Sequence, residues 1–330
     1  MKRLVKKEDL VRLIGSLLAG FEIIAPKEVP NKGIFYQVLE NGQDLSLGKG
    51  FAIEPIKRFF LEPSSWILRH GKNSGSEVES YPLPDKKRII IGARPCETRG
   101  LVLLDKIFDS EYKDDFYINN RKRTIIVGLL CSTPDKTCFC TSMNASPVES
   151  KGMDAYLLQL GRDLFVLETI SERSKGLFRD AGRDLTKEDE VLLDEAKKNC
   201  IDKIKKKIKV SEGLGKIFED DYWNEVSSSC INCGVCTFLC PTCHCFDLVD
   251  EERKRLRSYD GCSFPDFTLE SSGVNPRPTK RERYRQRVYH KFDYFKRNFG
   301  ENLCVGCGRC IRHCPVKIDI ADIVDKAPVK

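Results

Sequence analysis

Histidine is scarce in this chain and long apolar runs are missing. The 330 residues include four histidines, at positions 70, 244, 290 and 313. These are too few and too scattered for a histidine-rich metal site or a haem site. No apolar run approaches the length of a membrane span, and charged residues interrupt the basic N-terminal stretch, unlike a signal peptide. We therefore expect a soluble cytoplasmic protein without a membrane span.

Nucleotide-binding and nucleophile motifs are missing as well. No G-x-G-x-x-G run follows a predicted strand, and no G-x-x-x-x-G-K-[ST] run occurs. No serine–histidine or cysteine–histidine pair suggests nucleophilic chemistry. We therefore expect the chain to bind neither nicotinamide nor flavin itself and to depend on a partner that does.

Cysteine, by contrast, is abundant, with sixteen residues, and eight of them form two runs of identical spacing. Each run reads C-x-x-C-x-x-C-x-x-x-C-P, which is the bacterial ferredoxin spacing for [4Fe–4S] cubes. The first run contains Cys230, Cys233, Cys236 and Cys240, and the second contains Cys304, Cys307, Cys310 and Cys314. The repeated run predicts two neighbouring cubes in an electron-transfer protein.

The spacing also predicts which thiolates share a cube. Three cysteines surround one cube, and the fourth ligates the other cube in two-cluster ferredoxins. The first cluster is accordingly assigned to Cys230, Cys233, Cys236 and Cys314, and the second to Cys304, Cys307, Cys310 and Cys240. Gly234, Gly306 and Gly308 lie between ligands, where a small residue lets the backbone approach the cube.

Two zinc sites are the alternative for these runs, since C-x-x-C pairs also build zinc ribbons. A zinc site has no need of a third cysteine in register or of a fourth before proline. The runs therefore favour iron–sulfur clusters over a zinc-stabilised scaffold. Cysteines grouped in metal-binding runs also favour a reducing compartment over disulfide bonds.

Length and patterning indicate an α+β protein of two domains. We expect an N-terminal α/β domain over residues 1–215 and a mostly helical, dicluster ferredoxin-like domain with a basic insertion over residues 216–330. Apolar periodicity predicts the elements of the N-terminal domain. These are a helix over 4–18, strands over 52–61, 88–91 and 124–130, a hairpin over 156–167 and a helix over 185–209.

Four further cysteines follow two of these strands. Cys96 follows the strand at 88–91, and the strand at 124–130 is followed by Cys131, Cys138 and Cys140. If the two strands are neighbours in one sheet, their loops leave the same edge and the four thiols converge. Two interpretations stay open: a third [4Fe–4S] cluster, or buried thiols that pack as small hydrophobes. Of the remaining cysteines, Cys243 and Cys245 are interpreted as packing beside a cube, and Cys200 as structural.

Several motifs, in order, resemble one family. Residues 91–108, which begin Ile-Gly-Ala-Arg-Pro-Cys, are similar to a signature of the iron–sulfur subunits of sulfhydrogenases. That family includes the corresponding iron–sulfur component of anaerobic sulfite reductase. The segments 131–140, 240–245 and 277–280 are similar to the family in the same order. Glu97 stands where the family pattern leads us to expect aspartate, so the acidic group is kept.

The resemblance implies a subunit that relays electrons between two partners, a flavin- and NAD(P)H-binding subunit on one side, a catalytic subunit on the other. An alternative is a catalytic iron–sulfur protein that reduces a sulfur compound at the N-terminal cysteine site.

The net charge of +7 comes partly from basic runs at 203–209 and 280–287. Acidic residues are mixed through the chain, so we expect no nucleic-acid binding, and we interpret the second run as a contact with an acidic partner surface.

Overall fold

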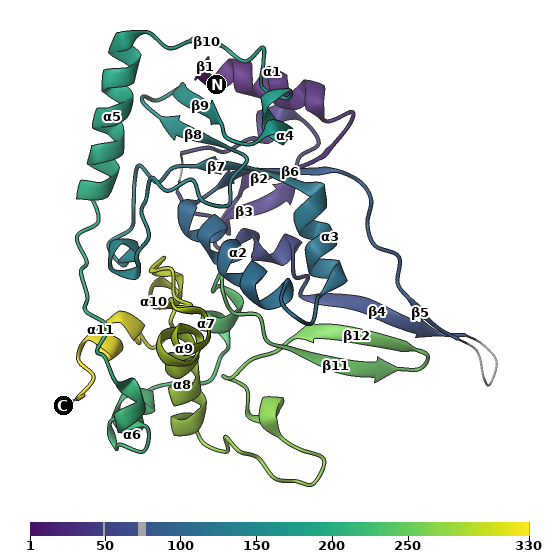
Figure 1. Cartoon of the computed structure of the whole chain (residues 1–330), viewed down its shortest axis with the longest axis vertical. Coiled ribbons are helices and arrows are strands. Elements are labelled where there is room, and N and C mark those ends of the chain that lie inside the picture. Colours follow the sequence, from purple (N-terminus) through teal and green to yellow (C-terminus); the bar gives the residue numbers. More distant parts are fainter. Residues whose placement is uncertain (49, 72–76, 330) are drawn as a thin grey trace. The chain divides into compact units, whose positions relative to one another are not determined.

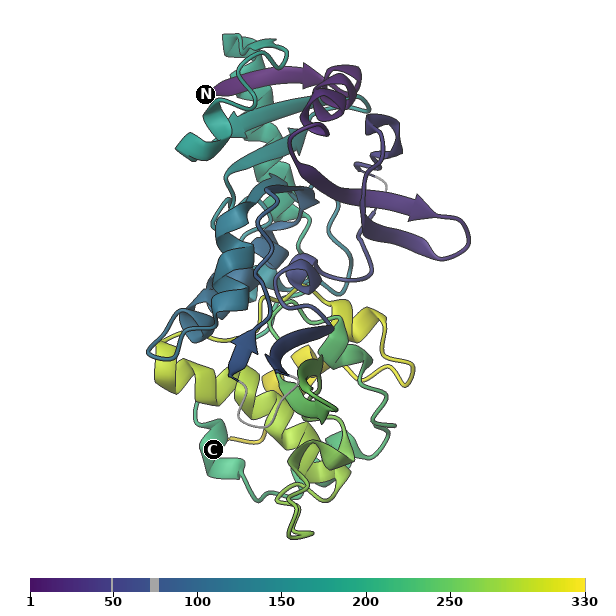
Figure 2. The same cartoon turned by 90° about the vertical axis from the view of Figure 1, so that its right-hand side faces the viewer.

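The computed structural model describes residues 1–48, 50–71 and 77–329. They form two compact units, which are described separately (Figures 1 and 2). The first unit comprises residues 1–56, 84–207 and 305–307, and the second comprises 57–83, 208–304 and 308–330. This division differs from the predicted boundary at residue 215. Residues 57–83 join the second unit because their strand β4 (Ser64–His70) pairs with β12 (Lys254–Tyr259).

An eight-stranded sheet forms the centre of the first unit, in the order β10-β1-β9-β8-β7-β6-β2-β3. Four neighbouring strands, β2, β6, β7 and β8, pair in parallel, and the pairs outside them are antiparallel. The β2–β3 hairpin forms one edge of the sheet and stands out in Figure 2. The strands are β1 (Lys2–Lys6), β2 (Glu22–Val29), β3 (Gly33–Val38), β6 (Arg88–Ala93), β7 (Thr124–Leu129), β8 (Ala155–Gln159), β9 (Leu164–Thr169) and β10 (Arg183–Asp184).

Helices cover this sheet on both faces. Leu10 and Ile14 of α1 pack with Ile89, Val127 and other residues of one sheet face. Residues of α5, including Leu193 and Cys200, pack with the opposite set of strand side chains. The helices are α1 (Lys7–Leu17), α2 (Pro95–Phe108), α3 (Asp115–Arg123), α4 (Glu172–Lys175) and α5 (Lys187–Asp202). This core holds in place the strand ends of β6 and β7, from which the cysteine-bearing loops leave.

The local predictions for this unit are confirmed in part. Strands occupy 88–93 and 124–129, and β8 and β9 form the expected antiparallel hairpin. The expected helix over 4–18 begins only at Lys7, because residues 2–6 pair with β9 as a strand. The expected strand over 52–61 is wrong, since residues 56–59 form a 3₁₀ turn. The long helix ends at Asp202, so the basic run 203–209 is not helical.

The second unit combines short helices with a four-stranded antiparallel sheet in the order β11-β12-β4-β5. The expectation of a mostly helical unit misses this sheet, in which the basic insertion pairs with residues 64–70 and these pair with residues 78–80. Its remaining strands are β5 (Val78–Ser80) and β11 (Phe246–Glu251). Its helices are α6 (Tyr222–Ser227), α7 (Val235–Phe238), α8 (Lys280–Tyr289), a π-helical turn (His290–Tyr294), α9 (Phe295–Phe299), α10 (Arg309–Arg312) and α11 (Ile320–Asp325).

Within the described ranges, no helix has the length and hydropathy required to cross a lipid bilayer.

Candidate metal centres

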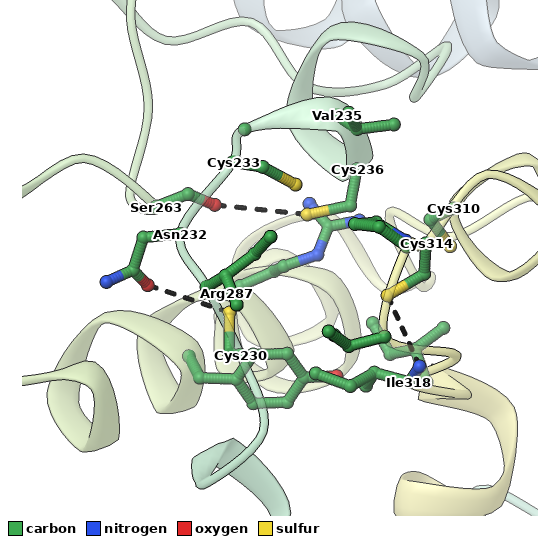
Figure 3. A pocket seen from close by; sticks show the side chains of 16 residues that line it. Cys230, Asn232, Cys233, Val235, Cys236, Ser263, Arg287, Cys310, Cys314 and Ile318 are labelled. Atoms are coloured by element: carbon green, nitrogen blue, oxygen red, sulfur yellow. Dashed lines mark hydrogen bonds between the residues drawn. The ribbon is translucent and has the colours of Figure 1, made fainter.

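One cavity of the second unit is lined by five of the predicted ligands. These are Cys230, Cys233, Cys236, Cys310 and Cys314. In Figure 3 the sulfur atoms of the four residues assigned to the first cluster face a common space, and Cys310 lies beside Cys314. Much of the remaining lining is apolar, with Ile231, Val235 and Ile318 among its residues. The fold therefore brings together thiols from two segments that are distant in the sequence.

Polar atoms approach three of these sulfur atoms. The backbone N–H of Ile318 donates to Sγ of Cys314 at 3.2 Å, and Ser263 Oγ lies 3.9 Å from Sγ of Cys236. The Cys230 thiol donates to Asn232 Oδ1 at 3.6 Å, and burial raises the pKa of this thiol. Hydrogen bonds to ligand sulfur atoms orient the side chains and tune the cluster that they bind.

The three glycines between the ligands have a left-handed backbone. The φ angles of Gly234, Gly306 and Gly308 are 73°, 64° and 68°. Residues with a Cβ atom are strained in this region. A Cβ atom on Gly234 would also lie 2.3 Å from the Phe264 ring. Glycine is thus required here by the sharp reversal of the chain from one ligand to the next.

The residues assigned to the second cluster fall into two groups. Cys240, Cys304 and Cys310 belong to the second unit, whereas Cys307 lies in the short segment 305–307 of the first unit. A hydrogen bond from the Cys243 thiol lowers the pKa of Cys240 well below its usual value. This side chain is thereby prepared to act as a thiolate ligand.

A separate cavity, in the first unit, gathers the four N-terminal cysteines. Its lining includes Cys96, Cys131, Cys138 and Cys140. The strands that precede them, β6 and β7, are parallel neighbours. Because parallel strands end at the same edge of a sheet, the two loops meet there. The four thiols therefore converge on one space, from loops more than thirty residues apart in the sequence.

The start of α2 places Cys96 at this cavity. β6 ends at Ala93 and α2 begins at Pro95, so Cys96 is the second residue of the helix. The backbone N–H of Arg94 donates to Glu97 Oε2 at 2.8 Å, so the side chain of the third helical residue caps the start of α2.

Residues of the second cysteine run also line this cavity. The backbone N–H of Phe139 donates to the carbonyl of Gly306 at 2.9 Å. The Cys138 thiol donates to the carbonyl of Cys307 at 3.6 Å. The N-terminal thiols are thus in direct contact with the main chain at a predicted ligand of the second cluster.

The chemistry of these thiols fits iron–sulfur clusters. Among the residues that the structure describes, no three His, Cys, Asp or Glu side chains are grouped so that they could hold one metal ion. Burial, together with the nearby Cys138 and Cys131, raises the pKa of Cys140 to about 12. A thiolate at that position therefore needs a cationic partner. The four irons of a cube supply this charge and bind thiolates spread around a wider space than a single ion does.

Comparison with known proteins gives two matches. The model of the 4Fe-4S dicluster domain family matches residues 229–318, which contain all eight ferredoxin-type cysteines. Over 303 residues the chain is 33% identical to "Sulfhydrogenase 2 subunit beta" of Pyrococcus furiosus, and the match covers 88% of each chain. The chain belongs to the sulfhydrogenase beta subunit family. The resemblance inferred from the sequence motifs is thereby confirmed, and no solved structure matches the chain.

Membership of the sulfhydrogenase beta subunit family and the dicluster domain define the class of this protein. It is an iron–sulfur electron-transfer subunit of an oxidoreductase and binds [4Fe–4S] clusters. Cys200 lies outside both thiol-lined cavities and is buried on α5 against the sheet, as expected of a structural residue.

The prediction that the basic run 280–287 of this sulfhydrogenase-family chain contacts a partner does not agree with its burial. Arg283, Arg285 and Arg287 are buried. Arg283 donates to the carbonyl of Pro278 at 2.8 Å, and Arg285 donates to the carbonyl of Phe218 at 2.6 Å. The interpretation of this run as a partner contact is therefore wrong for these three arginines. Their alternation with Tyr284 and Val288, both buried, was the available sign of an internal helix.

Proposed function

We propose that this chain relays single electrons between two partners, a flavin- and NAD(P)H-binding subunit on one side, a separate catalytic subunit on the other. The observation that carries the proposal is the ring of cysteines in Figure 3, within the region that the dicluster model matches. A flavin accepts a hydride as an electron pair, which one-electron carriers such as cubes pass on singly. Sixteen cysteines, many of them in clusters, also suit a reducing compartment, so the proposed location is the cytoplasm.

In this proposal each ferredoxin-type cluster takes three ligands from one cysteine run and its fourth ligand from the other run. The first cluster is held by Cys230, Cys233, Cys236 and Cys314, and the second by Cys304, Cys307, Cys310 and Cys240. The shared cavity of the first four residues supports the first assignment. Cross-ligation keeps the two cubes within tunnelling distance because each run contributes to both.

The proposal includes a third [4Fe–4S] cluster, bound by Cys96, Cys131, Cys138 and Cys140. Support comes from the convergence of these thiols on one cavity and from the high pKa of Cys140 in the absence of a cation. The hydrogen bond from the Phe139 N–H to the carbonyl of Gly306, and the 3.6 Å between Cys138 Sγ and the carbonyl oxygen of Cys307, give this cluster a short path to the second ferredoxin-type cluster. The order of electron transfer would then be third, second and first cluster, or the reverse.

Replacing Cys138 with serine tests the third cluster. We expect the iron content of anaerobically prepared protein to fall from about twelve to about eight atoms per chain. The EPR signals of the two ferredoxin-type cubes should remain. Cys200→Ser is the matched control, because Cys200 is equally buried but lies outside both thiol-lined cavities. A wild-type content of about eight irons, unchanged by Cys138→Ser, would show that these thiols bind no cluster.

A second experiment tests the relay itself. The reduced chain alone should bleach reversibly in the visible region and should turn over neither hydrogen nor NAD(P)H. Adding the flavin-binding and catalytic subunits should restore turnover. Reduction of a sulfur compound by the isolated chain with an artificial donor would favour the catalytic alternative, provided that Cys138→Ser abolishes it. Zinc in place of iron would contradict the electron relay and favour a zinc-stabilised scaffold.

A further inference from the structure

Three buried cationic residues of the second unit have no acidic partner. Lys57, Arg287 and Lys291 are 2%, 4% and 3% exposed. Across the described ranges, none of the three forms an ion pair with Asp or Glu. Burial lowers the pKa of Lys57. A buried charge without a counter-charge is strongly unfavourable, so a nearby anion would stabilise the charged forms of Arg287 and Lys291.

Lys291 is held beside one of the predicted cluster ligands. Its Nζ donates to Thr242 Oγ1 at 2.8 Å, and the same oxygen lies 3.3 Å from Sγ of Cys240. The Thr242 hydroxyl in turn donates to the carbonyl of Leu303 at 2.6 Å, which fixes its orientation. The backbone N–H of Leu303 donates to the carbonyl of Lys291 at 2.8 Å. These bonds anchor the ammonium group between Cys240 and the residue that precedes Cys304.

The helix carrying Lys291 determines which cysteines it faces. Lys291 lies in the π-helical turn that continues α8, and π turns often occur at functional sites. Through Thr242 Oγ1 the ammonium group is linked to Sγ of Cys240, and the Leu303 bond ties the same turn to the residue before Cys304. Cys240 and Cys304 are both assigned to the second cluster.

The other two residues differ from Lys291 in their contacts. Arg287 lies one turn earlier, donates to Sγ of Cys243 at 3.4 Å and also lines the cavity of the first cluster. Lys57 donates to the carbonyl of Cys243 at 2.7 Å and lies 4.7 Å from the centre of the Tyr259 ring. Of the three residues, Lys291 is the one whose hydrogen bond leads through a single hydroxyl, Thr242 Oγ1, to the sulfur of a residue assigned to the second cluster.

A cube with four thiolate ligands is an anion, and it gains a further negative charge on reduction. A fixed cation in a low-dielectric interior stabilises the reduced form more than the oxidised form. We propose that Lys291 raises the reduction potential of the cluster that Cys240 ligates, which makes this cluster the electron-accepting member of the ferredoxin-type pair. This inference rests on the proposed function, because it requires both cubes to be present.

The experiment is an EPR-monitored redox titration of the anaerobic full-length chain and of Lys291→Met. The variant should shift the potential of one ferredoxin-type cube downwards and leave that of the other unchanged. Lys291→Arg keeps the charge and should stay close to the wild-type value. Lys296→Met is the matched control: it removes a lysine nearby on the same helical stretch, but an exposed one, so both potentials should remain unchanged.

The outcomes separate this inference from the proposed function. Full iron content with both potentials unchanged in Lys291→Met would overturn the role of Lys291 and leave the relay intact. Absence of ferredoxin-type signals from the wild-type chain would overturn the relay itself. If Lys291→Met loses iron, the variant Thr242→Val tests the role of Lys291 instead. It removes the hydroxyl that holds the ammonium group and keeps the charge of Lys291. It should give a smaller downward shift of the same cube, and no shift would overturn the inference.

Discussion

Replacement of Gly306 by alanine is expected to remove the irons of the proposed N-terminal cluster and to lower the free energy of unfolding by about 2–5 kcal/mol. The added Cβ atom would lie 2.6 Å from both N and Cα of Cys140 and 2.7 Å from the carbonyl carbon of Phe139. These are backbone atoms, so they cannot move aside as a flexible side chain can. The left-handed φ of 64° adds its own strain. Iron analysis and thermal unfolding of the anaerobic protein would measure the two effects.

Gly300→Ala is the control for this prediction. Gly300 has a similar φ of 77° at the end of α9, but a Cβ atom there would meet nothing within 4 Å. This variant should show only the cost of left-handed strain, about 1–2 kcal/mol, and should retain all its iron. Equal losses in the two variants would show that the packing of Gly306 against Cys140 has no special importance.

Replacement of Glu97 by alanine is expected to destabilise the first unit by about 3 kcal/mol. Glu97 is 1% exposed, and its carboxylate accepts hydrogen bonds from Tyr36 Oη at 2.7 Å, Arg94 N at 2.8 Å and Ile56 N at 3.3 Å. Truncation would leave two buried backbone N–H groups without this acceptor and would remove the cap of α2. The midpoint of guanidinium unfolding would report the loss, and the adjacent Cys96 would make iron retention a second readout.

Glu282→Ala provides the comparison for Glu97. Glu282 likewise caps the start of α8, where the N–H of Thr279 donates to it at 3.0 Å, but it is less buried. Water can replace the lost hydrogen bond there, so we expect a cost of about 1 kcal/mol. Glu97→Gln keeps the shape and one acceptor oxygen and should lie between the two alanine variants. A Glu97→Ala cost no larger than that of Glu282→Ala would contradict the role assigned to burial.

Local patterns predicted those elements whose signal lies within a few residues. β6 and β7 were predicted by their unbroken apolar runs, and the β8–β9 hairpin by its alternation around Gly161. The errors occur where a distant partner determined the conformation. Residues 4–6 were included in the predicted helix, but residues 2–6 pair with β9, far along the chain, because the backbone bonds of the sheet outweigh a marginal helical turn. Residues 52–61 have strand composition but lie outside both sheets.

The sequence by itself determined the dicluster character of this protein, because ligand spacing around a cube is a local property of the chain. It also indicated the family and the pairs of loops that bear the N-terminal cysteines. Only the tertiary structure decided that Cys96, Cys131, Cys138 and Cys140 line one cavity, since that depends on β6 and β7 being neighbours. The tertiary structure also decided that Arg287 and Lys291 are buried beside sulfur atoms. The apolar residues Tyr284 and Val288 hinted at an internal helix, but the burial of its basic residues depends on what the rest of the fold places against them.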